Sequence, residues 1–182
     1  MPFSIGAPVV PVNIGTNTYI LGSGDYSVIG DLVLQNNETM FINGNTRLYV
    51  TGNFTMKNAS GTFLSIVPGG SLKVYIGTPG GAAVAGTFTQ VNNTGFAGAF
   101  QVFGLKSLTS LTWNGNTAFV GTIYAPYADY SMGGGGSTDF DFQGAATVRS
   151  VSLNGHFNFH YDQNLARNQK EAGFAVISWR EL

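Results

Sequence analysis

The chain has 182 residues, which suits one domain with a sizeable core, and its 43% hydrophobic content excludes a disordered chain. Eight basic residues against nine acidic ones, with no basic cluster among the aromatic residues, predict binding to neither nucleic acid nor an anionic membrane. The chain contains no cysteine, which excludes disulfides, thiolate metal sites and thiol nucleophiles.

Residues 1–15 are interpreted as an extended N-terminal arm, because prolines at positions 2, 8 and 11 interrupt an apolar stretch. We expect the arm to mediate self-association by adding as a strand to a neighbouring copy, through the apolar side chains of Val9, Val10, Val12 and Ile14. The sequence starts without the basic and apolar regions of a signal peptide, and no apolar run approaches the roughly 20 residues that span a bilayer. Either the chain is cytoplasmic or it is the mature or trimmed form of an exported protein. We favour the second, and we expect no insertion into a membrane.

Short β-rich runs follow one another from Thr18 onward, at a spacing of about ten residues, and Gly, Asn or Pro separates them. This spacing leaves no room for crossover helices, so the sequence predicts an all-β fold. Two glycine-rich segments, residues 77–86 and 133–136, are predicted to be loops inserted into the regular pattern.

Three of these runs end in an Asn-Gly pair, which turns the chain tightly because both residues tolerate positive φ. The pairs are Asn43-Gly44, Asn114-Gly115 and Asn154-Gly155, and the last two lie 40 residues apart. That interval is close to two coils of roughly 20 residues, so the pairs are predicted to mark the corners of a β-solenoid. The longer interval between the first two pairs is attributed to the inserted loops.

The end of the chain has a different character. Residues 162–172 have an aspartate suited to a helix N-cap followed by good helix formers, and Gly173 follows the last turn. Residues 174–179 then alternate like a final strand. A short helix and a strand are expected to cover the open apolar end of the solenoid. The predicted organisation is an arm over residues 1–15, a solenoid over residues 16–161 and a cap over residues 162–182.

The sequence resembles a known domain family over roughly residues 25–182, and the resemblance is most specific between residues 101 and 162. The residues that carry the resemblance are Gln101 to Leu105, Asn114 to Asn116, Phe119 to Pro126, Phe142 to Gly144, Val148 to Gly155 and Phe159 to Asp162. They are similar to an uncharacterised bacterial β-solenoid domain that is often found at the C-terminal end of pilus-assembly-like (PilX-type) and other envelope proteins. The resemblance implies a single right-handed parallel β-helix on a cell-surface or extracellular protein, and it implies no known catalytic residues.

The only two histidines, His156 and His160, are the first candidates for a metal site. Residues four apart on one strand are separated by about 13 Å, whereas the ligands of one zinc ion lie about 2 Å from it. The two histidines are therefore not expected to share a metal. We expect one face to carry His156, Asn158 and His160, while the other packs inside with Phe157, Phe159 and Tyr161.

Asp139 and Asp141 are the next candidates, because two carboxylates on one strand face lie about 6.6 Å apart, a separation that suits inverting glycoside hydrolysis. They follow a glycine-rich loop and alternate with phenylalanines, so we interpret them as solubilising residues. Weak Ca²⁺ binding with Asp129 stays an alternative. The sequence contains no recognisable hydrolase triad or phosphate loop, and no catalytic residue, cofactor or metal ligand is predicted.

The function that explains most residues is structural. We expect a non-enzymatic surface or extracellular protein that self-associates into a filament or surface assembly through its arm and its solenoid ends. One alternative is an adhesion module that binds glycans, through exposed aromatics such as Tyr127 and Tyr130, or binds ice. A second alternative is a polysaccharide-cleaving β-helix enzyme. Glycosylation stays open, at sequons that begin with Asn37, Asn53, Asn58 and Asn92.

Overall fold

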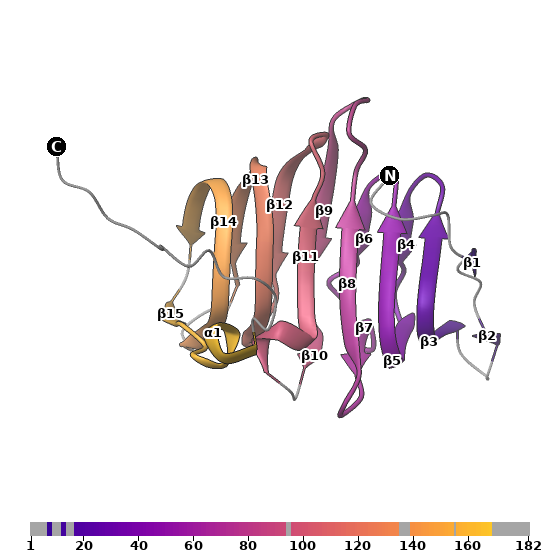
Figure 1. Ribbon diagram of the computed structural model, residues 1–182, viewed down its shortest axis with the longest axis horizontal. Helices are drawn as coiled ribbons and strands as arrows, with labels where there is room; N and C mark the ends of the chain where they lie inside the picture. The colour runs from indigo at the N-terminus through magenta and orange to yellow at the C-terminus, as the bar shows by residue number, and fades with distance from the viewer. Residues whose placement is uncertain are drawn as a thin grey trace, which may run out of the picture.

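The structure, a computed structural model, describes residues 7–8, 12–13, 17–93, 96–134, 139–154 and 156–168. It confirms the all-β prediction, because 65% of the described residues are in strands and parallel coils stack into a β-solenoid of about 6 turns (Figure 1). Polar contacts between neighbouring coils join residues that are 20 positions apart where coils are short and 32 apart where a loop is inserted.

Each coil contributes to three rows of parallel strands, and the longest strands bend from one row into the next. The first row contains the start of β3 (Asn17–Val28), of β5 (Thr39–Val50), of β13 (Phe119–Gly133) and of β14 (Phe140–Asn154), together with β7 (Phe63–Ile66), β10 (Val91–Asn93) and β15 (Phe157–His160). The second row contains later parts of the same long strands with β8 (Ser71–Ile76) and β11 (Phe100–Gly104).

The third row contains β4 (Leu32–Leu34), β6 (Phe54–Met56), β9 (Val84–Phe88), β12 (Leu108–Asn114) and the ends of β13 and β14. Figure 1 shows the second row in front and the third row behind it. A 3-10 turn, η1 (Ala97–Ala99), precedes β11, and a short helix, α1 (Asn164–Asn168), follows β15. No helix among the described residues is long and apolar enough to cross a membrane.

The core consists of inward-facing side chains that stack in columns from coil to coil. The rings of Phe54 and Phe88 lie 4.6 Å apart, and those of Phe119 and Phe142 lie 4.7 Å apart, while Phe100 joins the two pairs. All five rings are at most 2% exposed. Full burial of such a side chain contributes roughly 2–3 kcal/mol, so these columns hold the coils together.

Two of the three Asn-Gly pairs lie at one corner. Asn114 pairs in register with Gly133 on the next coil, and Gly133 pairs with Asn154 on the coil after that. Gly115 is needed there because a Cβ at this position would collide with the carbonyl oxygen of Thr89 on the preceding coil. Gly155 lies outside the described residues.

The first pair, Asn43-Gly44, lies at a different corner, inside β5 and between the first and second rows. Gly44 has a φ of 148°, and a Cβ there would collide with the side chain of Ser23 on the first coil. The uneven interval between the first and second pairs therefore reflects two different corners, in addition to the longer coils between them, where Asn45 pairs with Ser71 and Lys73 pairs with Gln101.

The described parts of the N-terminal arm run along the first coil. β1 (Ala7–Pro8) pairs parallel with Tyr26 and Ser27 of β3, and β2 (Val12–Asn13) pairs antiparallel with the start of β3. Val9, Val10 and Ile14 lie outside the described residues. The part of the predicted C-terminal helix beyond α1, residues 169–172, also lies outside the described residues, as does the predicted strand over residues 174–179.

Candidate functional site

The columns of core side chains become exposed to solvent at the end of β14 and in β15. Val151 continues the column of Leu111 and Tyr130, and Leu153 continues that of Trp113 and Met132. The earlier members are at most 2% exposed, whereas Val151 is 54% exposed and Leu153 is 48% exposed.

The first row ends in the same way. The ring of Phe159 lies against that of Phe142 at a centroid distance of 5.1 Å, but no described strand pairs beyond β15, and 51% of the residue is exposed. We call Val151, Leu153 and Phe159 together the open end. They are side chains of core type, placed where a further coil would pack.

The strand edge at this end is also uncovered among the described residues. β15 pairs with residues 140–143 of β14, while the remainder of β14 pairs with β13 alone. An edge of this kind presents unpaired N–H and C=O groups, which favour pairing with another strand. The open end therefore combines apolar side chains with an available backbone edge.

Asp162 fastens the chain after β15 back onto the solenoid. Its carboxylate accepts hydrogen bonds from the backbone N–H of Ala97 and of Asn164, both at 2.9 Å, and the residue is 5% exposed. These backbone donors, that of Ala97 first, hold the pKa of Asp162 below its usual value. The sequence suggested the local bond at the start of the helix, but the contact with Ala97 spans 65 positions and had no local signal.

The candidate catalytic and metal residues are solvated. Asp141 Oδ1 lies 3.3 Å from His160 Nε2 and 3.4 Å from Asn158 Nδ2, and the side chains of Asp141 and His160 are both more than half exposed. Asp139 and His156 are exposed as well. Within the described ranges, no group of three or more His, Asp or Glu residues is placed to hold a metal ion.

Asp129 is engaged elsewhere, and the described residues do not group it with Asp139 and Asp141 at a metal site. Its carboxylate forms a bidentate ion pair with Arg149 on the next coil, and Ser150 Oγ donates a hydrogen bond to the same carboxylate at 2.6 Å. The hydrogen bond from Arg149 is the main reason that the pKa of Asp129 is lowered to about 2.

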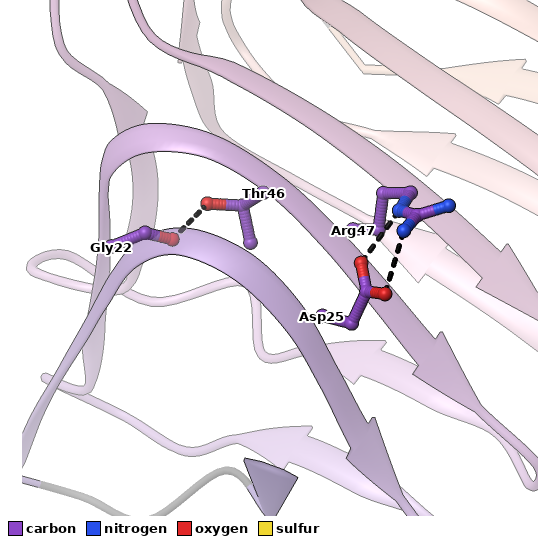
Figure 2. A network of polar contacts seen from close by, with 4 residues as sticks. All are labelled: Gly22, Asp25, Thr46 and Arg47. Atoms are coloured by element: carbon purple, nitrogen blue, oxygen red, sulfur yellow. Dashed lines mark hydrogen bonds and ion pairs between the residues drawn. The ribbon is translucent and has the colours of Figure 1, made fainter. Parts of the chain in front are cut away.

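A similar pair lies near the other end of the solenoid (Figure 2). Arg47 on the second coil contacts both carboxylate oxygens of Asp25 on the first coil at 2.6 Å, and beside it Thr46 Oγ1 donates to the carbonyl of Gly22 at 2.8 Å. Because the ion pair is partly exposed, it is expected to align neighbouring coils more than to stabilise them.

Two expectations about aromatic side chains are wrong. Phe159 and Tyr161 were expected inside but are 51% and 61% exposed, because no described strand packs beyond β15. Tyr130, which was named with Tyr127 only as a candidate for glycan contact, is 2% exposed in a core column, and burial raises its pKa. Tyr127 is 50% exposed, as expected.

Comparison with curated proteins and with solved structures gives no significant match. A family model described as a domain of unknown function (DUF7305) matches residues 10–168. This match includes every row of the solenoid and both strands of the open end. The chain therefore belongs to the DUF7305 family.

Proposed function

We propose that this protein is a non-enzymatic structural module that self-associates, and that a second copy of the chain covers its open end. The observation that supports this proposal is the half-exposed state of Val151, Leu153 and Phe159, whose column neighbours in the preceding coils are buried.

A second copy fits because the natural complement of one solenoid coil is another coil. Two open ends facing each other about a two-fold axis would place the same surface on both sides of the contact. The chain carries a formal net charge of −1, so long-range repulsion between copies is small.

The expected affinity follows from the size of the open end. Burying three half-exposed apolar side chains on each copy contributes on the order of 5–9 kcal/mol. Association costs roughly 4–15 kcal/mol in lost freedom, so strand-edge pairing must supply the remainder. We expect assembly at tens of micromolar protein rather than at nanomolar concentrations.

The N-terminal arm is the second contact in this proposal. In one copy, β1 and β2 pair with β3 of the same chain. An arm exchanged between copies would add to the same edge of a neighbour's β3, through a segment that includes Val9, Val10, Val12 and Ile14. With contacts at both ends, copies would join into a filament or surface layer.

We place this assembly outside the cell or on its surface, as the resemblance to envelope and PilX-type pilus-like proteins implies. Protease accessibility of the protein on intact bacterial cells, compared with lysed cells, tests the location. Cleavage only after lysis would contradict it.

The proposal of self-association is tested by substituting one side chain of the open end. Leu153→Asp in the full chain puts a charge into the contact, and Tyr127→Asp is the matched control, because Tyr127 is 50% exposed on β13, outside both proposed contacts. Light scattering coupled to size exclusion, from 5 to 200 micromolar, measures the mass, and electron microscopy shows whether ordered polymers form.

We expect the wild type and Tyr127→Asp to gain mass with concentration, while Leu153→Asp loses the contact at the open end. A wild type that stays monomeric over this range contradicts the proposal. In that case, a stability loss in monomeric Leu153→Asp would assign the cover to the chain itself, such as residues 174–179.

A further inference from the structure

A column of aromatic rings lies on the outer side of the second row. Tyr49, Tyr75, Phe103 and Tyr124 follow one another in register on β5, β8, β11 and β13. The rings of Tyr75 and Phe103 stack at 4.9 Å with an interplanar angle of 13°. Tyr124, the last member, is 55% exposed.

A polar column runs beside the rings. Lys73, Gln101 and Thr122 are also in register, two positions before the aromatic residues on the same strands. Side chains two positions apart on a strand point to the same side, so these amide, hydroxyl and ammonium groups lie next to the rings.

Phe103 and Tyr124 of the aromatic column, together with the whole polar column, line a groove of about 470 Å³. One side is made by Phe96 and Gly98 at the η1 turn, and another by Tyr161 and Leu165, which follow β15. The hydrogen bond from Ala97 to Asp162 joins these two segments and so fixes the shape of the groove. Tyr161, which lines the groove, is 61% exposed.

The described residues that line the groove are uncharged, with one exception. Aromatic and small apolar residues alternate with hydroxyl and amide groups, Lys73 is the one cation, and none of the described lining residues is acidic. A sugar ring has an apolar C–H face that lies flat on an aromatic ring, and a rim of hydroxyl groups that pair with amide and hydroxyl side chains. The volume is within the range of small-ligand sites.

We propose that this groove binds a neutral oligosaccharide. Phe103, Tyr124 and Tyr161 supply the flat apolar contacts, and Gln101 and Thr122 hydrogen-bond the sugar hydroxyls. The proposal concerns a different surface from the open end and does not depend on self-association.

The test measures binding of defined hexasaccharides of glucose, N-acetylglucosamine, xylose and mannose by isothermal titration calorimetry on the full chain. Insoluble cellulose and chitin form a second arm, which separates recognition of a free oligosaccharide from recognition of a polymer surface. Tyr124→Ala and Tyr161→Ala remove the exposed rings, and Tyr127→Ala is the matched control, because Tyr127 is 50% exposed and does not line the groove.

We expect at least one of these probes to bind, with an affinity about tenfold lower in Tyr124→Ala and in Tyr161→Ala and unchanged in Tyr127→Ala. Thermal unfolding followed by circular dichroism checks that the variants are folded. The oligomeric state should be the same in Tyr124→Ala as in the wild type, which keeps this result separate from the open end. Absence of binding to every probe at 10 mM, or equal binding by Tyr124→Ala, would overturn the proposal.

Discussion

The two ends of the solenoid differ in what the chain places over them. At the N-terminal end, β1 and β2 pair with the two halves of β3, so the first coil has a strand on its outer edge. At the other end, the later part of β14 has a strand partner on one side only within the described part of the chain, and the open end is half exposed. Stability in a solenoid comes from contacts between neighbouring coils, so the final coil is held less firmly than the interior.

The largest expected effect separates the interior from the open end. Phe119 contacts the rings of Phe100, Trp113 and Phe142, so Phe119→Ala should lower the free energy of unfolding by about 4 kcal/mol. Phe159→Ala should cost about 1 kcal/mol or less, because that ring is already half exposed. Urea denaturation at 1 micromolar protein measures both. Equal losses would mean that the chain itself covers Phe159 in solution.

A smaller loss of unfolding free energy is expected when the hydrogen bond from Ala97 to Asp162 is removed. This bond links the two segments that flank the groove. Asp162→Ala leaves the backbone N–H groups of Ala97 and Asn164 without their acceptor and should cost about 3 kcal/mol in unfolding free energy. Asp162→Asn keeps an acceptor oxygen and should cost less. Urea denaturation distinguishes the two variants, and a wild-type stability in Asp162→Ala would show that the link does not hold this end.

The same carboxylate makes the C-terminal end sensitive to acid. The pKa of Asp162 is lower in the folded protein than its unfolded value of about 3.9, so its contribution to stability is complete above that value. The contribution is lost as the pH falls through the lowered folded pKa. Unfolding free energies from pH 6 to pH 2 should decline more steeply in the wild type than in Asp162→Asn. Parallel curves would contradict this.

The smallest effect concerns the two ion pairs on the outer surface. Arg149→Gln should raise the pKa of Asp129 from about 2 toward its usual value, without fully reaching it because Ser150 still donates. Titration by NMR of the Asp129 carboxyl measures the change. Arg47→Gln, at the opposite end, is the control and should leave Asp129 unaffected. Neither variant should change the stability much, since exposed pairs contribute little.

The solenoid was predictable because its signals are local. Most strands lie within short β-rich runs, although β9 begins inside the segment 77–86 that was predicted to be a loop. Asn114 and Asn154 mark one corner at an interval of two coils. The corner to which Asn43-Gly44 belongs was not predictable. The position of a corner depends on the lengths of the strands before and after it. Those lengths vary with each inserted loop.

The sites were less predictable because they depend on register between coils. The neighbours Lys73 and Gln101, or Tyr75 and Phe103, are far apart in the sequence, and their pairing follows only from knowing where each coil begins. The contact of Asp162 with Ala97 crosses more than one coil. The exposure of Phe159 depends on whether another coil follows it, which alternation of side chains does not reveal.

The in-register stacking of coils also has a kinetic consequence. Pairs between neighbouring coils, such as Asp25 with Arg47 and Asp129 with Arg149, join residues about one coil apart, so folding is expected to spread from one coil to the next. Opening should proceed in the reverse order, starting where a coil has one neighbour. Backbone amides at the end of β14 would then exchange with deuterium before those of β8 and β11, so the time course of exchange would map the order in which the coils separate.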